Sequence, residues 1–252
     1  MIPLPVLAID TATSRTVARL VMGGAPGGPR FGRDVVAARH GGELLPAIEA
    51  CFAEAGRGVE ALGAVVVGTG PGSFTGVRIG MAAAKTIAYA RRLPILGVPT
   101  PVALAAATLA AEGGLGRAAD LLVVQPAGPS DRYVTRIRWT PGEPDAAGEA
   151  RLAYEVTEGP RIAPPREDLV EALGGAVLVA IDLDADLSSG DEARQRSRRA
   201  LEGLGDALLD VGLARLERSQ QDDVSELVPA YVTLPRGVEE AAAAVAWAPE
   251  LG

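Results

Sequence analysis

The sequence predicts an α/β protein made of two similar halves, and three features carry that prediction. Short apolar runs typical of strands alternate along the chain with helical periodicities. The order strand-strand-strand-helix-strand-helix occurs once, and a weaker version of it follows from about residue 119. A buried strand, a glycine-rich turn and a helix come in succession at Ala64–Lys85. Such a repeated order is typical of a duplicated α/β architecture.

The first half opens with an apolar strand, Val6–Asp10, which ends in a carboxylate and a small polar turn. Further strands are expected at Thr16–Met22 and Asp34–Arg39, because a loop rich in Gly and Pro separates two β-type runs. A helix is predicted over His40–Ala55, where apolar residues recur on one stripe. These elements form a three-strand meander followed by a helix.

The helix after the glycine-rich turn is expected to continue to about Arg91. Pro94–Val98 then predicts a strand, and Thr100–Ala111 predicts a helix with a proline in its first turn. The second half is predicted to contain strands at Leu121–Gln125, Tyr133–Trp139, Ala150–Val156 and Ala176–Ile181, and helices at Leu169–Leu173 and Glu192–Arg218, the last being the longest. In the tail, Val228–Leu234 is expected as an edge strand and Val238–Trp247 as a helical or frayed segment.

Four glycines fall within the nine residues of the segment 68–76, here called the glycine loop. Glycine allows close approach of a ligand or of another backbone, and a helix that starts there presents free N–H groups. The Walker A, dinucleotide GxGxxG and nucleophile-elbow GxSxG patterns all fail against these letters. Two interpretations stay open, an anion cradle and a tight strand-to-helix turn. The residues concerned are Gly70, Gly72, Ser73, Thr75 and Gly76.

Composition excludes several classes of function. The 24 basic and 32 acidic residues give a net charge of −8, which argues against binding nucleic acid through the chain's own field. The single cysteine, Cys51, excludes an internal disulfide, fits a cytoplasmic protein and is expected as a buried structural thiol. The N-terminal residues lack the basic region of a signal peptide, and no apolar run approaches the about 20 residues needed to cross a bilayer.

The single histidine, His40, limits catalytic chemistry. One histidine without a cysteine partner cannot build a usual zinc site, and triad catalysis needs a histidine beside a nucleophile. His40 stands at the start of the predicted helix, where a capping or solvated role is expected. The sequence therefore favours a chain with no catalytic residue and no metal site of its own.

Four segments together resemble the bacterial TsaB (YeaZ) family. They are LAIDTATS at Leu7–Ser14, HGGELLPAIEACFAEAG at His40–Gly56, GTGPGSFTGVRIGMAAAK at Gly68–Lys85 and LPILGVPTPVALA at Leu93–Ala105. Their order and spacing also fit, and the resemblance covers about residues 6–110. It implies the ASKHA (actin-like, Hsp70-like) fold of two tandem RNase H-like lobes, at residues 1–105 and 106–220, followed by a tail at 221–252.

The resemblance also implies a function. A TsaB-type chain is expected to be a non-catalytic subunit that binds and activates the catalytic subunit TsaD in forming N6-threonylcarbamoyladenosine at position 37 of tRNA. The ATPase TsaE is an expected further partner, tRNA is contacted only indirectly, and a homodimer is a further expected assembly. ATP or ADP and Mg²⁺ are the cofactors expected in the complex.

Two interpretations of the turn after the first strand stay open. In ASKHA ATPases a carboxylate at this place approaches the metal-bound nucleotide, so Asp10, Thr11 and Thr13 are expected near any nucleotide. Alternatively, Asp10 caps the turn that follows it. The first interpretation belongs with an alternative function, a weak ATPase or small-molecule kinase. A peptidase is disfavoured because it needs a nucleophile with a base, or a metal cluster.

The resemblance places the partner interface on the helix at 40–55 and on the helix after the glycine loop. The residues expected there are Glu43, Leu44, Leu45, Ile48, Arg78 and Met81. The alternative is that both apolar stripes simply pack on the sheet. One departure from the family lies at Val123–Trp139, where two prolines are expected to weaken a central strand.

Overall fold

The computed structural model describes residues 5–23, 28–36, 42–144, 150–164, 169–182 and 191–232. The first half forms a five-stranded sheet in the order β3-β2-β1-β4-β5. Its strands are β1 (Val6–Asp10), β2 (Arg15–Val21), β3 (Arg30–Val36), β4 (Ala64–Gly68) and β5 (Ile95–Val98). The strands β1, β2 and β3 are antiparallel neighbours, whereas β4 runs parallel to both β1 and β5.

The second half repeats this plan with a four-stranded sheet in the order β8-β7-β6-β9. Its strands are β6 (Ala119–Pro126), β7 (Arg132–Pro144), β8 (Ala150–Ala163) and β9 (Val177–Ala180). The first strand of each half pairs antiparallel with the next strand and parallel with a later one. The predicted duplication is therefore confirmed. The prolines expected to weaken a strand do not interrupt β6, because Pro126 is its last residue.

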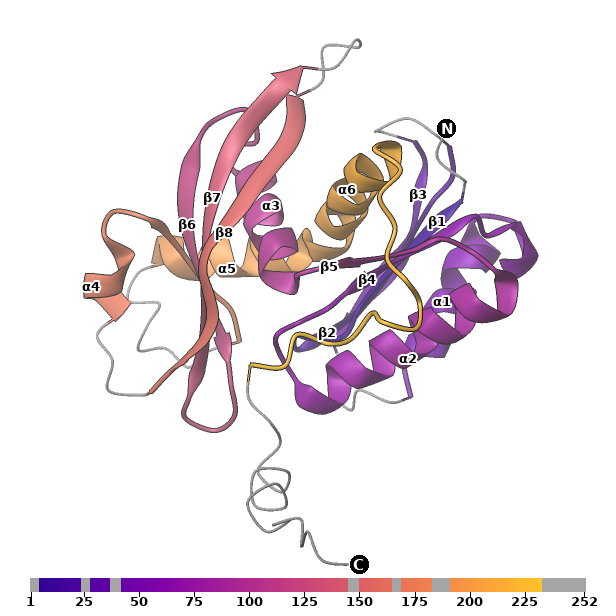
Figure 1. Ribbon diagram of the computed structural model, residues 1–252, viewed down its shortest axis with the longest axis horizontal. Helices are drawn as coiled ribbons and strands as arrows, with labels where there is room; N and C mark the ends of the chain where they lie inside the picture. Colours follow the sequence, from indigo (N-terminus) through magenta and orange to yellow (C-terminus); the bar gives the residue numbers. More distant parts are fainter. Residues whose placement is uncertain are drawn as a thin grey trace, which may run out of the picture.

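Helices cover both faces of the first sheet. Helices α1 (Leu44–Glu54) and α2 (Phe74–Arg91) pack on one face together with alternate residues of β1, β2 and β4. Helix α6 (Leu204–Glu217) packs on the other face, and a 3₁₀ turn, η1 (Val59–Ala61), precedes β4. In the second half, α4 (Leu169–Leu173) and α5 (Asp191–Glu202) flank the sheet. Figure 1 shows α3 (Thr100–Ala111) and α6 between the two sheets.

Helix α3 joins the two halves into one core. Ten of its twelve residues are buried, so it is apolar around its whole circumference rather than on one stripe. One cluster of buried residues contains side chains from β1, α3, β6 and α6. The expected boundary at residue 105 falls inside this helix.

The prediction of one long helix over Glu192–Arg218 is wrong. The chain turns at Gly203, and α5 and α6 point in different directions (Figure 1). A Cβ on Gly203 would lie 3.2 Å from the Cβ of Ala107, so α3 packs closely against this turn. The turn is needed because α5 covers the second sheet whereas α6 covers the first.

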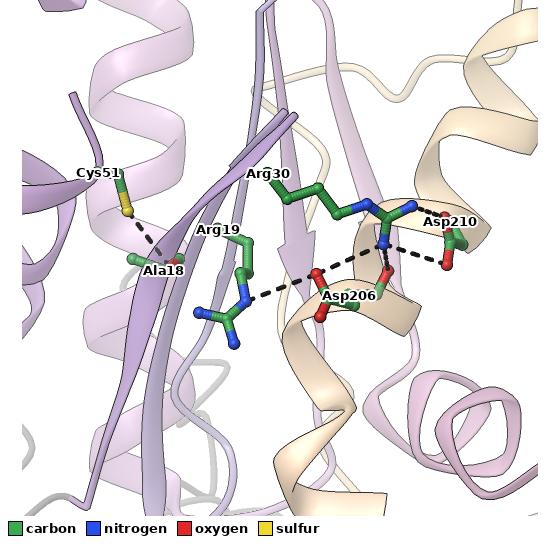
Figure 2. Close-up of polar contacts among 6 residues, drawn as sticks. All are labelled: Ala18, Arg19, Arg30, Cys51, Asp206 and Asp210. Carbon is green, nitrogen blue, oxygen red and sulfur yellow. Dashed lines mark hydrogen bonds and ion pairs between the residues drawn. The ribbon is translucent and has the colours of Figure 1, made fainter. Parts of the chain in front are cut away.

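Ion pairs hold α6 on the first sheet although it lies within the expected second lobe. Arg30 on β3 pairs with Asp210 and, at 3.4 Å, with Asp206, while Arg19 on β2 lies 3.6 Å from Asp206 (Figure 2). Burial raises the pKa of the Asp210 carboxyl, and the adjacent Arg30 guanidinium opposes that rise. The same view shows the buried Cys51 thiol donating to the Ala18 carbonyl at 3.3 Å, as expected of a structural cysteine.

The chain after α6 does not form the strand predicted from Val228. Residues 228–232 have no strand structure, and a bridge to β5 is made earlier, between Asp222 and Ile95. Residues 219–232, here called the C-terminal strap, instead run from α6 along β5 and across α2. The histidine His40 and the segment Val238–Trp247 lie outside the described residues.

Candidate functional site

Close backbone contacts account for the glycine loop. A Cβ on Gly72 would lie 2.1 Å from the Ala12 carbonyl oxygen, and one on Gly76 would lie 2.0 Å from that of Thr11. Both distances are shorter than real Cβ contacts. The loop and the first turn of α2 can therefore pack against the β1–β2 turn only because these two positions are glycines. Ser73 begins the helix, because its side chain accepts from the Gly76 N–H at 3.2 Å.

The Thr11 hydroxyl fastens the β1–β2 turn to α2. It donates to the Gly76 carbonyl at 2.7 Å and accepts from the Gly80 N–H at 3.1 Å. These two groups are four residues apart, so in a regular α-helix they would bond to each other. A Cβ on Gly80 would lie 2.3 Å from this hydroxyl oxygen, which explains a third glycine in the same row. The turn therefore sets the position of α2.

Asp10 is fully buried, and both of its carboxylate oxygens are hydrogen-bonded within the chain. Oδ1 accepts from the Ala12 N–H at 2.8 Å, and Oδ2 accepts from the Thr100 hydroxyl at 2.6 Å. Thr100 accepts in turn from the Gly70 N–H at 3.1 Å. A Cβ on Gly68 would lie 1.8 Å from Oδ2. Burial raises the Asp10 pKa to about 6, and the bonds from Thr100 and Ala12 partly offset it.

The environment of Asp10 is not suited to binding a Mg²⁺-bound nucleotide. A hard cation needs several oxygen ligands with free lone pairs, and the Asp10 oxygens face protein donors at close range. Across the described ranges, no three His, Cys, Asp or Glu side chains group as a metal site. Thr13 is buried and bonds locally to Arg15, and Thr75 is exposed at the start of α2. The hydrogen bond from the Ala12 N–H to Asp10 is the contact expected if Asp10 caps the turn that follows it.

Side chains of the second half form hydrogen bonds to this region. The Ser14 N–H and hydroxyl donate to the Asp182 carboxylate at 2.7 and 2.5 Å. The Gln125 side-chain amide donates to the Pro71 carbonyl at 3.1 Å, within the glycine loop. The two halves therefore meet at the loop and the turn that position α2.

The six residues expected at a partner interface divide into two groups. Leu44, Ile48 and Met81 are buried against the first sheet and so hold α1 and α2 in place. Leu45 and Arg78 are exposed, and Glu43, just before α1, is half-buried. On α2 and the strap, the structure adds exposed apolar side chains that sequence reasoning did not place at an interface: Phe74, Tyr89, Val228 and Tyr231. No periodicity could find the last two, because they lie in the irregular strap.

A groove of about 600 Å³ lies where the strap passes between β5, α6 and β8, and Thr69 of the glycine loop is part of its lining. It is lined by, among others, Gly97, Tyr154, Arg215, Arg218 and Asp222. Arg215 donates to the Gly97 carbonyl and to Gln220, so its side chain braces the strap. None of the predicted site residues lines this groove.

Similarity to known proteins agrees with the resemblance found in the sequence. The family model described as TsaD, tRNA N6-adenosine threonylcarbamoyltransferase, matches residues 34–159, half of the chain. A protein of Mycobacterium tuberculosis is 36% identical over 160 residues, which are 63% of this chain and 70% of that one. The Haemophilus influenzae protein named tRNA threonylcarbamoyladenosine biosynthesis protein TsaB is 33% identical over 104 residues, 41% of this chain and 43% of the relative.

The chain belongs to the TsaB (YeaZ) family. The structure of YeaZ from Pseudomonas aeruginosa superimposes with a TM-score of 0.63 at 23% identity, covering 90% of this chain and all of that one. This likeness concerns the fold alone. The ASKHA fold class that the resemblance implied is confirmed. In the part of the TsaB-type chain that the structure describes, no helix is long and apolar enough to cross a membrane.

Proposed function

We propose that this chain is the TsaB-type subunit of tRNA N6-threonylcarbamoyladenosine biosynthesis, and that it acts by binding a TsaD-type catalytic subunit. The observation that carries the proposal is the outer surface of α1 and α2. Leu45 is 63% exposed on α1 and Tyr89 is 76% exposed on α2. Large apolar side chains at such exposure on neighbouring helices are typical of a partner surface.

The glycine loop supports this role because it fixes one of those helices. Thr11 and three glycines hold α2 against the β1–β2 turn, so its outer surface is preorganised. A preorganised surface loses less conformational entropy when it binds. The chain would therefore offer its partner a rigid platform.

The chemistry of Asp10 supports a non-catalytic role. Both carboxylate oxygens accept hydrogen bonds inside the chain, which leaves them poorly placed to hold a metal-bound nucleotide. In this proposal ATP or ADP and Mg²⁺ bind to the partner proteins, a TsaE-type ATPase among them, and tRNA is contacted through the complex. The proposal also places the chain in the cytoplasm.

Titration of the full chain with its cognate TsaD-type subunit tests the proposal. We expect a complex at micromolar concentration or below by native mass spectrometry and calorimetry. Leu45→Glu and Tyr89→Glu should each weaken it at least ~10-fold, because each places a charge in the apolar contact. Val156→Glu is the matched control, since Val156 is exposed on β8 of the second sheet. Absence of any complex with the unchanged chain would refute the proposal.

A further inference from the structure

The C-terminal strap is bonded to both β5 and α2. The Asp222 N–H donates to the Ile95 carbonyl at 2.9 Å, and the Asp222 carboxylate accepts from the Gly97 N–H at 2.7 Å. Lys85 on α2 donates to the Leu227 carbonyl at 2.9 Å. Figure 1 shows this segment passing from α6 toward α2. The strap therefore covers the edge of the first sheet and ends on the helix that the proposed function assigns to a partner.

At its end, the strap encloses the side chain of Arg78 together with α2. The Arg78 guanidinium carbon lies 4.2 Å from the ring centre of Phe74 and 5.7 Å from that of Tyr231. Arg78 Nε donates to the Tyr231 hydroxyl at 3.0 Å, and the two ring centres are 5.9 Å apart. Two aromatic rings and one hydrogen bond thus fix the orientation of an exposed cation.

This cation has no carboxylate partner among the described residues. Among these residues, Arg78 makes one hydrogen bond, through Nε, and contacts the two aromatic rings. The two terminal amines of the guanidinium are left to solvent. Other arginines of the chain, such as Arg30, are paired with carboxylates. A guanidinium held in one orientation with both terminal amines free suits two-point binding of a carboxylate.

Two exposed aromatic rings lie against the guanidinium, and Val228, which precedes Tyr231 in the strap, is a further exposed apolar side chain. Phe74 is 42% exposed, Tyr231 46% and Val228 61%. These are three of the seven large apolar side chains that the described residues leave exposed, and two of them come from the strap. Arginine and tyrosine next to apolar surface are the typical components of an interface hot spot.

We propose that Phe74, Arg78, Val228 and Tyr231 form a docking site for a protein segment that carries a carboxylate beside an apolar side chain. The inference rests on the proposed function, in that the segment belongs to the TsaD-type subunit. The strap then has a functional role as well as a structural one, because it supplies half of the site and holds Arg78 in position. A nucleic-acid phosphate is the less suitable occupant, because the chain carries a net charge of −8.

Substitutions in the full chain, measured as affinity for the TsaD-type subunit by calorimetry, test the site. Arg78→Ala should weaken binding at least ~30-fold, and Arg78→Lys about 10-fold, because lysine keeps the charge but loses the planar fork. Tyr231→Phe should weaken binding about 3-fold, since it removes only the bond that orients Arg78. Arg138→Ala is the matched control, because Arg138 is an exposed arginine on β7.

Thermal unfolding of each variant separates docking from support of the strap. The melting temperature of Arg78→Lys and Tyr231→Phe should stay within about 2 °C of the unchanged chain while affinity falls. If Arg78→Ala binds within twofold of the unchanged chain while Leu45→Glu does not, the docking site is refuted and the proposed function stands. Loss of tRNA affinity without loss of subunit affinity in Arg78→Ala would also refute it. If the unchanged chain forms no complex, the proposed function itself has failed.

Discussion

Asp10 and Gln125 occupy equivalent positions in the two halves of the molecule. In each half the first strand pairs antiparallel with the next strand and parallel with a later one. Asp10 and Gln125 each directly follow the last residue of that parallel pairing, and both are buried. Asp10 bonds to its own turn and, through Thr100, reaches Gly70. Gln125 reaches across to Pro71. Both polar side chains therefore support the glycine loop of the first half.

The difference between the halves lies in what surrounds equivalent strands. In the first half, the parallel strand β4 leads through the glycine loop into the 18 residues of α2. In the second half, β9 ends near Asp182, whose carboxylate bonds back to Ser14. The same strand order therefore has a different role in each half. One half presents helices at the surface, and the other half holds them in place.

The largest expected effect comes from the close glycine contacts of α2 in the first half. Gly76→Val should destabilise the chain by more than about 4 kcal/mol or prevent folding, because its Cβ would lie 2.0 Å from a backbone oxygen. Urea unfolding measures the change. Gly116→Ala is the control, since a Cβ there meets nothing within 4 Å. If Gly76→Val unfolds like the unchanged chain, the proposed close packing of α2 is incorrect.

A smaller effect should follow from the ionisable side chain of the first half. Burial raises the Asp10 pKa from 3.8 to about 6, so the folded chain holds more protons than the unfolded chain between these pH values. The free energy of unfolding should therefore increase, by up to ~3 kcal/mol, as pH falls from about 7 to about 4. Urea unfolding across this range measures it.

Asp10→Asn supplies the control for this pH dependence, because it keeps the shape of the side chain and removes the titrating proton. The difference in unfolding free energy between the two chains should change with pH only in the window between about 4 and 6. Parallel profiles over that window would contradict the assignment of a raised pKa to Asp10.

The smallest effect is expected at the equivalent position in the second half. Gln125 makes one bond, to Pro71, while its Oε1 has no hydrogen-bond partner among the described residues. Gln125→Leu removes that bond and also an unsatisfied buried acceptor, so it should change stability by no more than about 1 kcal/mol. Thermal unfolding measures it beside Asp10→Leu, which should cost several-fold more. Equal costs would show that the two halves support the loop to the same degree.

Local pattern was enough to predict most elements of the fold. The bounds of α3 and α4 agree with the predicted helices, and the strands of both sheets were located to within a few residues, except that β7 and β8 extend beyond them. The break at Gly203 could not be predicted, since the helical periodicity continues through it. It arises because α5 and α6 pack on different sheets.

The candidate site was predictable only in part. The pattern of apolar residues located the two helices. Because Leu44, Ile48 and Met81 are buried, the apolar stripe marks the face that packs on the sheet and not the face open to a partner. The exposed positions follow from the three-dimensional packing. Tyr231 is 153 residues from Arg78 in the sequence, so their contact could not be inferred from spacing.

The sequence by itself determined the duplicated α/β plan, the family and the position of the glycine loop, because periodicity and motifs are local properties. Tertiary structure decided what the loop does. The carbonyl oxygens of Ala12 and Thr11 occupy the space where side chains at Gly72 and Gly76 would lie. The neighbouring Asp10 carboxylate accepts hydrogen bonds from Thr100 and Ala12. Tertiary structure also brought the strap onto α2. Contacts between distant segments depend on how helices and sheets pack, and this information is not present in any one stretch of the chain.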